Sequence, residues 1–150
     1  MRGTIDSFWK ASNYMYHHGA RRLGRILELF SMTISSHGVS AQIDIGKDSI
    51  FLHHALGCVV LETTRIGCGC IIMQNVTIGN TFSDKTKNLG GCCSIGDNVV
   101  IGAGACILGH VHVGNNVTIG ANAVVLKDVE DNTVVAGVPA KIKRVKEVIK

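Results

Sequence analysis

Aliphatic residues recur at every sixth position along much of this chain. They form two runs, Val60, Ile66, Ile72, Ile78 and then Ile95, Ile101, Ile107, Val113, Ile119, Val125. Four positions after the repeated residue stands a small or β-branched one, at Cys70, Val76, Val99, Ala105, Val111, Val117 and Ala123. A period of six matches neither a helix nor a hairpin strand, whose periods are 3.6 and 2. It fits short strands joined by tight turns, each placing two residues inward, with three strands in a triangular coil of about eighteen residues. The pattern predicts a mainly β fold, a parallel β-helix of hexapeptide repeats.

Glycine often follows the repeated position, where a corner needs positive φ or a close approach between backbones. The repeat is interrupted between Ile78 and Ile95, and the residues in between are polar and glycine-containing. We expect a loop over residues 80–93 that projects from one corner. Such a loop is either functional or a tolerated surface insertion.

The two ends of the chain depart from the repeat. Residues 1–36 are expected to form a helical segment, with Gly19 separating two helices. The coil is expected over residues 37–138. Residues 139–150 alternate lysine with aliphatic side chains, and we expect a short helix or strand that closes the last coil.

Composition limits the possible functions. The chain has 150 residues, 46% hydrophobic and 17% charged, so we expect one ordered domain. A net charge of +4 is too weak to indicate nucleic-acid binding. The six cysteines match no zinc spacing, so we expect free thiols and no metal. Neither a membrane span nor a secretory signal is recognised, so we expect a cytoplasmic protein.

Two segments resemble a known family. Residues 50–63, which read IFLHHALGCVVLET, are similar to the active-site stretch of serine acetyltransferases, and residues 119–141 are similar to the closing segment of that family. The resemblance covers about residues 43–143 and is specific to the hexapeptide-repeat acyltransferase superfamily. It implies a left-handed β-helix, a homotrimer or a pair of such trimers, and acetyl-CoA as the acyl donor.

The resemblance also implies catalytic residues. His54 matches the family's histidine, which takes a proton from the acceptor hydroxyl while the oxygen attacks the thioester; histidine titrates near neutrality and suits this role. His53 is the alternative, because some sugar-linked relatives carry the histidine one place earlier. Neighbours on a strand face opposite ways, so we expect only one of the two to reach the groove, and we favour His54. Glu62 matches the family glutamate near the histidine, although it also fits a solvated corner carboxylate.

Two departures from the family bear on the acceptor. Val39 stands where the family has an aspartate that pairs with the histidine; Asp44 is a conceivable substitute. Gly91 and Cys92 stand where the family has an Arg-His pair that binds the serine carboxylate. Without that cation a carboxylate lacks a bidentate partner, so a sugar hydroxyl fits better than L-serine.

The resemblance implies that pantetheine lies along a groove between two subunits. The matching donor-binding positions are Asn80, Thr81, Ala103, Ala121, Lys127 and Lys141, with Arg144 as a further cation for the CoA phosphates. The leading hypothesis is an acetyl-CoA-dependent O-acetyltransferase acting on a small molecule or sugar. The alternatives are a serine acetyltransferase of cysteine biosynthesis and a non-catalytic β-helix scaffold subunit.

Overall fold

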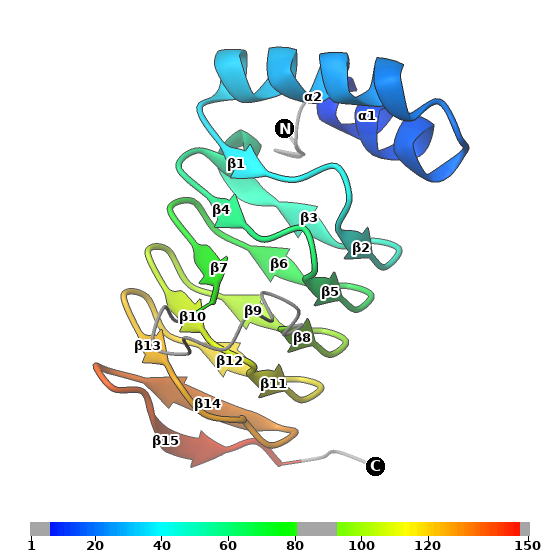
Figure 1. Ribbon diagram of the computed structural model, residues 1–150. Helices are drawn as coiled ribbons and strands as arrows, with labels where there is room; N and C mark the ends of the chain where they lie inside the picture. The colour runs from blue at the N-terminus through cyan, green and yellow to red at the C-terminus, as the bar shows by residue number, and fades with distance from the viewer. Residues whose placement is uncertain (1–6, 81–92, 148–150) are drawn as a thin grey trace, which may run out of the picture.

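A computed structural model of the chain describes residues 7–80 and 93–147 and is a parallel β-helix capped by two helices (Figure 1). Three sheets form the faces of a triangular prism, and consecutive strands pass from one face to the next. Face A contains β1 (Gly38–Val39), β4 (Val59–Val60), β7 (Thr77–Gly79), β10 (Cys106–Leu108) and β13 (Val124–Val125). Face B contains β2 (Asp44–Ile45), β5 (Arg65–Ile66), β8 (Ser94–Ile95) and β11 (His112–Val113). Face C contains β3 (Ile50–Phe51), β6 (Ile71–Ile72), β9 (Val100–Ile101), β12 (Thr118–Ile119), β14 (Thr133–Ala136) and β15 (Lys141–Val145).

The six-residue repeat supplies the core, as predicted. All ten repeated aliphatic positions from Val60 to Val125 are buried, and so are the seven positions four residues after them. Successive coils pair in parallel and in register, for example Val59 with Thr77 and then Thr77 with Cys106. The sequence therefore predicted both the architecture and the inward-facing residues.

Three series of turns form the corners of the prism. Corner CA joins face C to face A and comprises residues 52–58, 73–76, 102–105 and 120–123; the turn 137–140, which links β14 to β15 within face C, stacks on this corner. Corner AB comprises residues 40–43, 61–64, 109–111 and 126–128, together with Asn80 and Cys93, the described residues next to β7 and β8. Corner BC comprises residues 46–49, 67–70, 96–99, 114–117 and 130–132.

Corner BC shows why glycine follows the repeated residue. A Cβ atom on Gly67 would lie 2.6 Å from the carbonyl carbon of Gly96 in the next coil, so only glycine allows the two turns to stack. Side chains also link the turns, since the Asp97 carboxylate accepts the backbone N–H of Cys68 at 2.7 Å.

On either side of the interruption of the repeat, the chain leaves and re-enters the coil at the same corner. Strand β7 belongs to face A and β8 to face B, so the chain leaves and re-enters the coil at corner AB. Of the predicted loop 80–93, residues 81–92 lie outside the described part of the chain.

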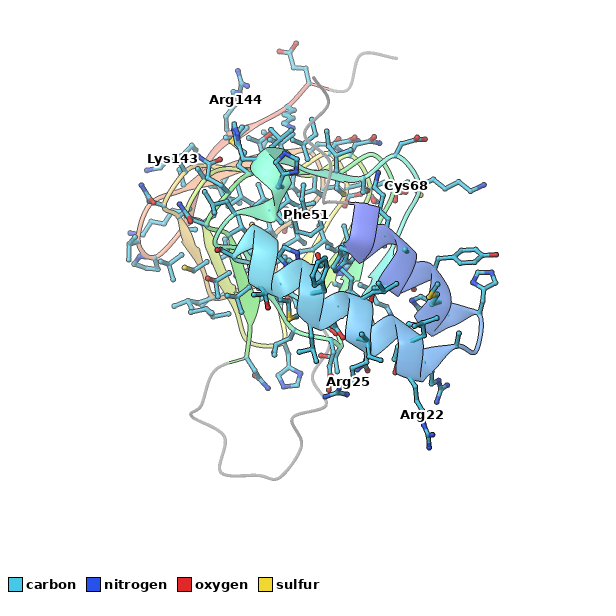
Figure 2. All side chains as sticks on the ribbon, turned by 90° about the horizontal axis from the view of Figure 1, so that it is seen from above. Arg22, Arg25, Phe51, Cys68, Lys143 and Arg144 are labelled. Atoms are coloured by element: carbon cyan, nitrogen blue, oxygen red, sulfur yellow. The ribbon has the colours of Figure 1, made fainter. Side chains whose placement is uncertain are left out.

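Two helices cover the N-terminal end of the coil. They are α1 (Ser7–His17) and α2 (Arg21–Ser35), separated at Gly19 as predicted, and Figure 2 shows both lying across the end of the prism. The first coil has no preceding coil to pair with, so its backbone needs other partners. The indole of Trp9 donates to the carbonyl of Val39 at 2.9 Å, and the Glu28 carboxylate accepts the N–H of Ala41 at 2.7 Å. The helices therefore satisfy the open edge of the coil.

At the other end of the coil, the closing segment after residue 139 was expected to be a short helix or a strand, and it forms a strand. Strand β15 pairs antiparallel with β14 and leaves all five of its side chains exposed. No helix in residues 7–80 and 93–147 is long and apolar enough to cross a membrane.

Candidate active site

The two candidate catalytic histidines lie in a strained turn at corner CA. Strand β3 ends at Phe51, and His53, His54 and Ala55 then take left-handed backbone conformations, with φ of 53°, 56° and 57°. For residues other than glycine this conformation costs roughly 1–2 kcal/mol each. Such strain persists only where neighbouring structure enforces it, and it clusters at functional sites.

The two histidines do not lie where the sequence analysis placed them. The histidines were expected on a strand, where only one could reach a groove, but neither lies in a strand and both side chains are exposed. Strand alternation therefore does not choose between His53 and His54, and both imidazoles reach the outer surface of corner CA.

Backbone hydrogen bonds hold this turn from three sides. The N–H of Cys58 donates to the carbonyl of Ala55 at 2.8 Å within the turn. The N–H of Asn75 in the next coil donates to the carbonyl of Leu56 at 2.8 Å, and the N–H of Gly57 donates to the carbonyl of Ser36 at 3.0 Å. The histidines thus stand on a turn fixed to the rest of the coil.

Glu62 lies at corner AB, beyond the opposite end of strand β4 from the histidines. Since a strand rises about 3.3 Å per residue, the stretch 58–61 alone separates the two corners by roughly 10 Å. A single protomer therefore holds Glu62 and His54 at different corners of the prism.

Glu62 lines a polar surface cavity of about 540 Å³. The other lining residues come from α1, from face B and from corner AB: His17, Gln42, Asp44, Thr63, Thr64 and Arg65. Asp44, the conceivable substitute for the missing aspartate, therefore lies with Glu62 and not on the histidine corner.

The candidate donor-binding residues divide between the same two corners. Ala103 and Ala121 lie on corner CA, two and three coils beyond the histidine turn, while Asn80 and Lys127 lie on corner AB. Thr81 is outside the described residues. Lys141 and Arg144 lie on β15. The other described donor-binding candidates are therefore at the two corners that bound face A.

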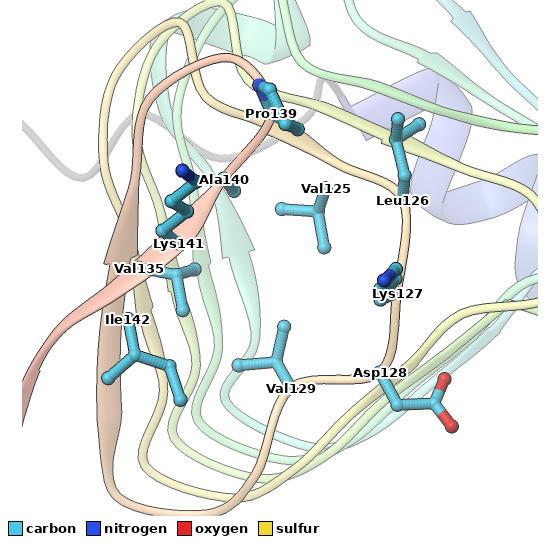
Figure 3. Close-up of a pocket in the computed structure, with 10 residues that line it drawn as sticks. All are labelled: Val125, Leu126, Lys127, Asp128, Val129, Val135, Pro139, Ala140, Lys141 and Ile142. Carbon is cyan, nitrogen blue, oxygen red and sulfur yellow. The ribbon is translucent and has the colours of Figure 1, made fainter.

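The C-terminal end of the coil brings two of the candidate cations together. A cavity of about 430 Å³ opens there, lined by Lys127 and Lys141 as well as by core valines such as Val125 and Val135 (Figure 3). Arg144 is exposed on β15 and does not line this cavity. Two lysines that are distant in sequence thus line one largely apolar cavity, together with the acidic Asp128.

Four of the described cysteines, Cys58, Cys68, Cys70 and Cys106, have free thiols. Burial raises the pKa of the Cys58 thiol and of the Cys70 thiol, whereas Cys68 is exposed. Among the described residues no three histidine, cysteine or acidic side chains gather closely enough to hold a metal ion.

Arg65 and His17 were missed by the sequence analysis. The signal for Arg65 was available in the repeat, because it precedes the inward-facing Ile66 and must therefore point outward. No sequence signal connects His17, on helix α1, with the cavity at corner AB.

Comparison with known proteins agrees with this architecture. Residues 89–127 match the family described as bacterial transferase hexapeptide (six repeats). The serine acetyltransferase of Synechococcus elongatus is 33% identical over 133 residues, which cover 89% of this chain and 53% of that protein. The serine acetyltransferase of Mycobacterium tuberculosis is 35% identical over 140 residues, covering 92% and 59%. The chain thus spans about half the length of the curated relatives it matches.

Solved structures give the same result. The serine acetyltransferase of Neisseria gonorrhoeae superposes with a TM-score of 0.82 at 30% identity, covering 94% of this chain and 52% of that one. The serine acetyltransferase of Brucella abortus in complex with coenzyme A also gives a TM-score of 0.82, at 32% identity, covering 95% and 55%.

Proposed function

The chain belongs to the hexapeptide-repeat acyltransferase superfamily and is serine acetyltransferase-like, and on that premise we propose that it transfers an acetyl group from acetyl-CoA to a hydroxyl. The observation that carries this proposal is the pair of exposed histidines on a strained turn, within the segment that resembles the family's active site. The coenzyme A complex of the Brucella abortus relative supports acetyl-CoA as the donor.

The proposed chemistry is direct transfer with one histidine as general base. An alcohol is too weakly acidic to ionise at neutral pH, whereas a neutral imidazole can take its proton as the oxygen attacks. The oxygen bonds to the thioester carbonyl carbon, and the tetrahedral intermediate then expels the CoA sulfur. The sulfur leaves with the proton that the imidazole carries, so the base is regenerated. His54 remains the preferred base, and His53 its neighbour at the same site.

A trimer accounts for the division of the candidate residues between two corners. Exposed apolar side chains lie on the outer side of face A and where its strands pass into corner AB: Val59 on β4 is 49% exposed, and Leu61 and Leu126 at corner AB are 39% and 50% exposed. Face B carries Asp44, Arg65, Ser94 and His112 in the corresponding outward row. Three left-handed coils with face A turned toward a common axis would bury the apolar rows and leave the polar face outside.

This arrangement sets corner CA of one protomer against corner AB of the next. Strand β4 joins the two corners within one coil, so His54 of one protomer and Glu62 of its neighbour would lie at nearly the same height. Below them, Ala103 and Ala121 would line one wall of the cleft, and Asn80 and Lys127 the other. An extended pantetheine fits a cleft of this form.

An acceptor screen tests the proposal. Release of CoA thiol from acetyl-CoA should be measured with L-serine and with uncharged sugars, for the unchanged protein and for the His54→Ala and His53→Ala variants. We expect acetylation of at least one acceptor, and a loss of at least about 100-fold in kcat when the general base is removed. Serine acetyltransferase activity is the second candidate, favoured by the named relatives. Thiol release that neither histidine variant reduces would exclude the histidine mechanism, and the absence of any release would favour the scaffold alternative.

A further inference from the structure

The polar cavity at corner AB is lined by a cationic side chain, that of Arg65. Arg65 lies just outside residues 50–63, the stretch that resembles the family's active site. Arg65 lines this cavity together with Glu62, the glutamate already assigned to the site. Arg65 opens strand β5 on face B, and its side chain is exposed. The strand fixes the Cα position of Arg65 and the direction in which its side chain leaves the coil.

The Arg65 guanidinium is available for a ligand. Its in-register neighbours on face B are Asp44 in the preceding coil and Ser94 in the following one. Within residues 7–80 and 93–147 its side chain has no hydrogen-bond or ion-pair partner, and the Ser94 hydroxyl is engaged with the imidazole of His112 at 2.8 Å. A guanidinium presents a planar fork of donors that matches a carboxylate bidentately.

The other charged groups of the cavity restrict what binds there. Asp44 and Glu62 contribute two carboxylates, and His17 contributes an imidazole. A simple dianion would be repelled by the two acids, whereas a ligand with one carboxylate beside hydroxyl or ammonium groups meets both signs of charge. Arg65 would hold the carboxylate, and Glu62 and Asp44 would accept hydrogen bonds from the donors.

We propose that Arg65 is a specificity-determining residue that binds a carboxylate of the acceptor. The cation absent at Gly91 and Cys92 is thereby supplied from a different position, on face B. This inference rests on the proposed acetyl transfer to a hydroxyl. It reverses the expectation that the missing Arg-His pair disfavours acidic acceptors.

Two matched pairs of acceptors test the inference. L-Serine and L-serinamide differ by a carboxylate in place of a carboxamide, and so do methyl glucuronide and methyl glucuronamide. The two pairs separate an amino-acid source of the carboxylate from a sugar source. We expect the protein to prefer the acidic member of at least one pair. The Arg65→Gln variant should lower kcat/KM for that member roughly 10- to 100-fold, mainly through KM, and leave the neutral member within about twofold. Arg65→Lys should recover only part of the loss, because an ammonium cannot bind bidentately.

The control variant is Arg22→Gln, which removes an exposed arginine from α2 that does not line the cavity (Figure 2). It should change neither member of either pair. Thermal unfolding of all three variants checks that the coil is intact. Equal losses for acidic and neutral acceptors in Arg65→Gln, or no preference in the unchanged protein, would overturn the inference while leaving acetyl transfer in place. Absence of thiol release with every acceptor would overturn the proposed function and the inference together.

Discussion

Gly57 lies directly over the side chain of Asn75 in the next coil: a Cβ atom added to Gly57 would overlap the Asn75 Oδ1 atom. Gly57 also has a φ of 66°, a conformation that strains any other residue. It closes the turn that carries His53 and His54. The close packing of Gly57 against Asn75 thus supports the turn that positions the candidate base.

Replacing Gly57 with alanine should therefore disturb both stability and activity. The conformation alone costs roughly 1–2 kcal/mol, and the contact with Asn75 adds to it. We expect a lower thermal midpoint at fixed protein concentration and a loss of thiol release larger than the loss of folded protein. Gly19→Ala is the matched control, because Gly19 also has positive φ but has open space around it. The Gly57→Ala, Asn75→Ala double variant should lose less than the sum of the two single variants; simple additivity would contradict the contact.

A second prediction concerns the helical cap. The Glu28 carboxylate is buried and accepts the N–H of Ala41 at 2.7 Å, so Glu28→Ala leaves a buried donor without its partner. We expect a loss of about 1–3 kcal/mol in the free energy of unfolding, measured by urea titration at fixed protein concentration. Glu28→Gln keeps an acceptor oxygen and should lose less. Glu130→Ala, which removes an exposed glutamate at corner BC, should have little effect on the free energy of unfolding. An equal loss in Glu130→Ala would mean that the hydrogen bond between Glu28 and Ala41 does not account for the loss in Glu28→Ala.

The six-residue repeat predicted the coil because burial is periodic. Each inward residue, such as Ile72 or Ile107, is required by the core, and a regular core leaves a regular trace in the sequence. The helices were predictable for the same reason, and Gly19 marked their boundary. Where every coil repeats the same packing, sequence alone indicates which side chains are inside.

The site was less predictable because it lies where the repeat is broken. The left-handed turn at His53 and His54 interrupts strand alternation, and no period encodes it. Glu62 is only eight residues after His54, yet a triangular coil carries it to another corner. Glu62 and Arg65 are close in the sequence, but the cavity they line also takes Asp44 from the preceding coil and His17 from α1, and only the fold brings these residues together.

A third prediction follows from the cysteines. Burial raises the pKa of the Cys58 and Cys70 thiols, so their reactive thiolate fraction at pH 8 is smaller than that of an ordinary thiol. Brief treatment with iodoacetamide should label exposed Cys68 first, and labelling of the buried pair should rise only as the pH approaches their raised pKa. Peptide mass mapping measures each site. In concentrated urea the three thiols should react alike, and fast native labelling of Cys58 would contradict its burial.

The shared cleft predicts that two inactive proteins can restore each other. In the proposed trimer each site takes His54 from one protomer and Glu62 from the next, so His54→Ala and Glu62→Ala each disable a different wall. Random mixing of the two variants, by co-expression or by refolding together, rebuilds about one intact site in four. We expect thiol release near a quarter of that of the unchanged protein, whereas each variant alone stays low.

A mixture of His54→Ala with His53→Ala is the control, because both changes fall on the same corner. In that mixture every wall lacks one of the two histidines, so mixing cannot raise thiol release above the average of the two components. Thiol release from the first mixture no greater than the average of its two components would mean that the histidine and the glutamate do not act across a protomer boundary.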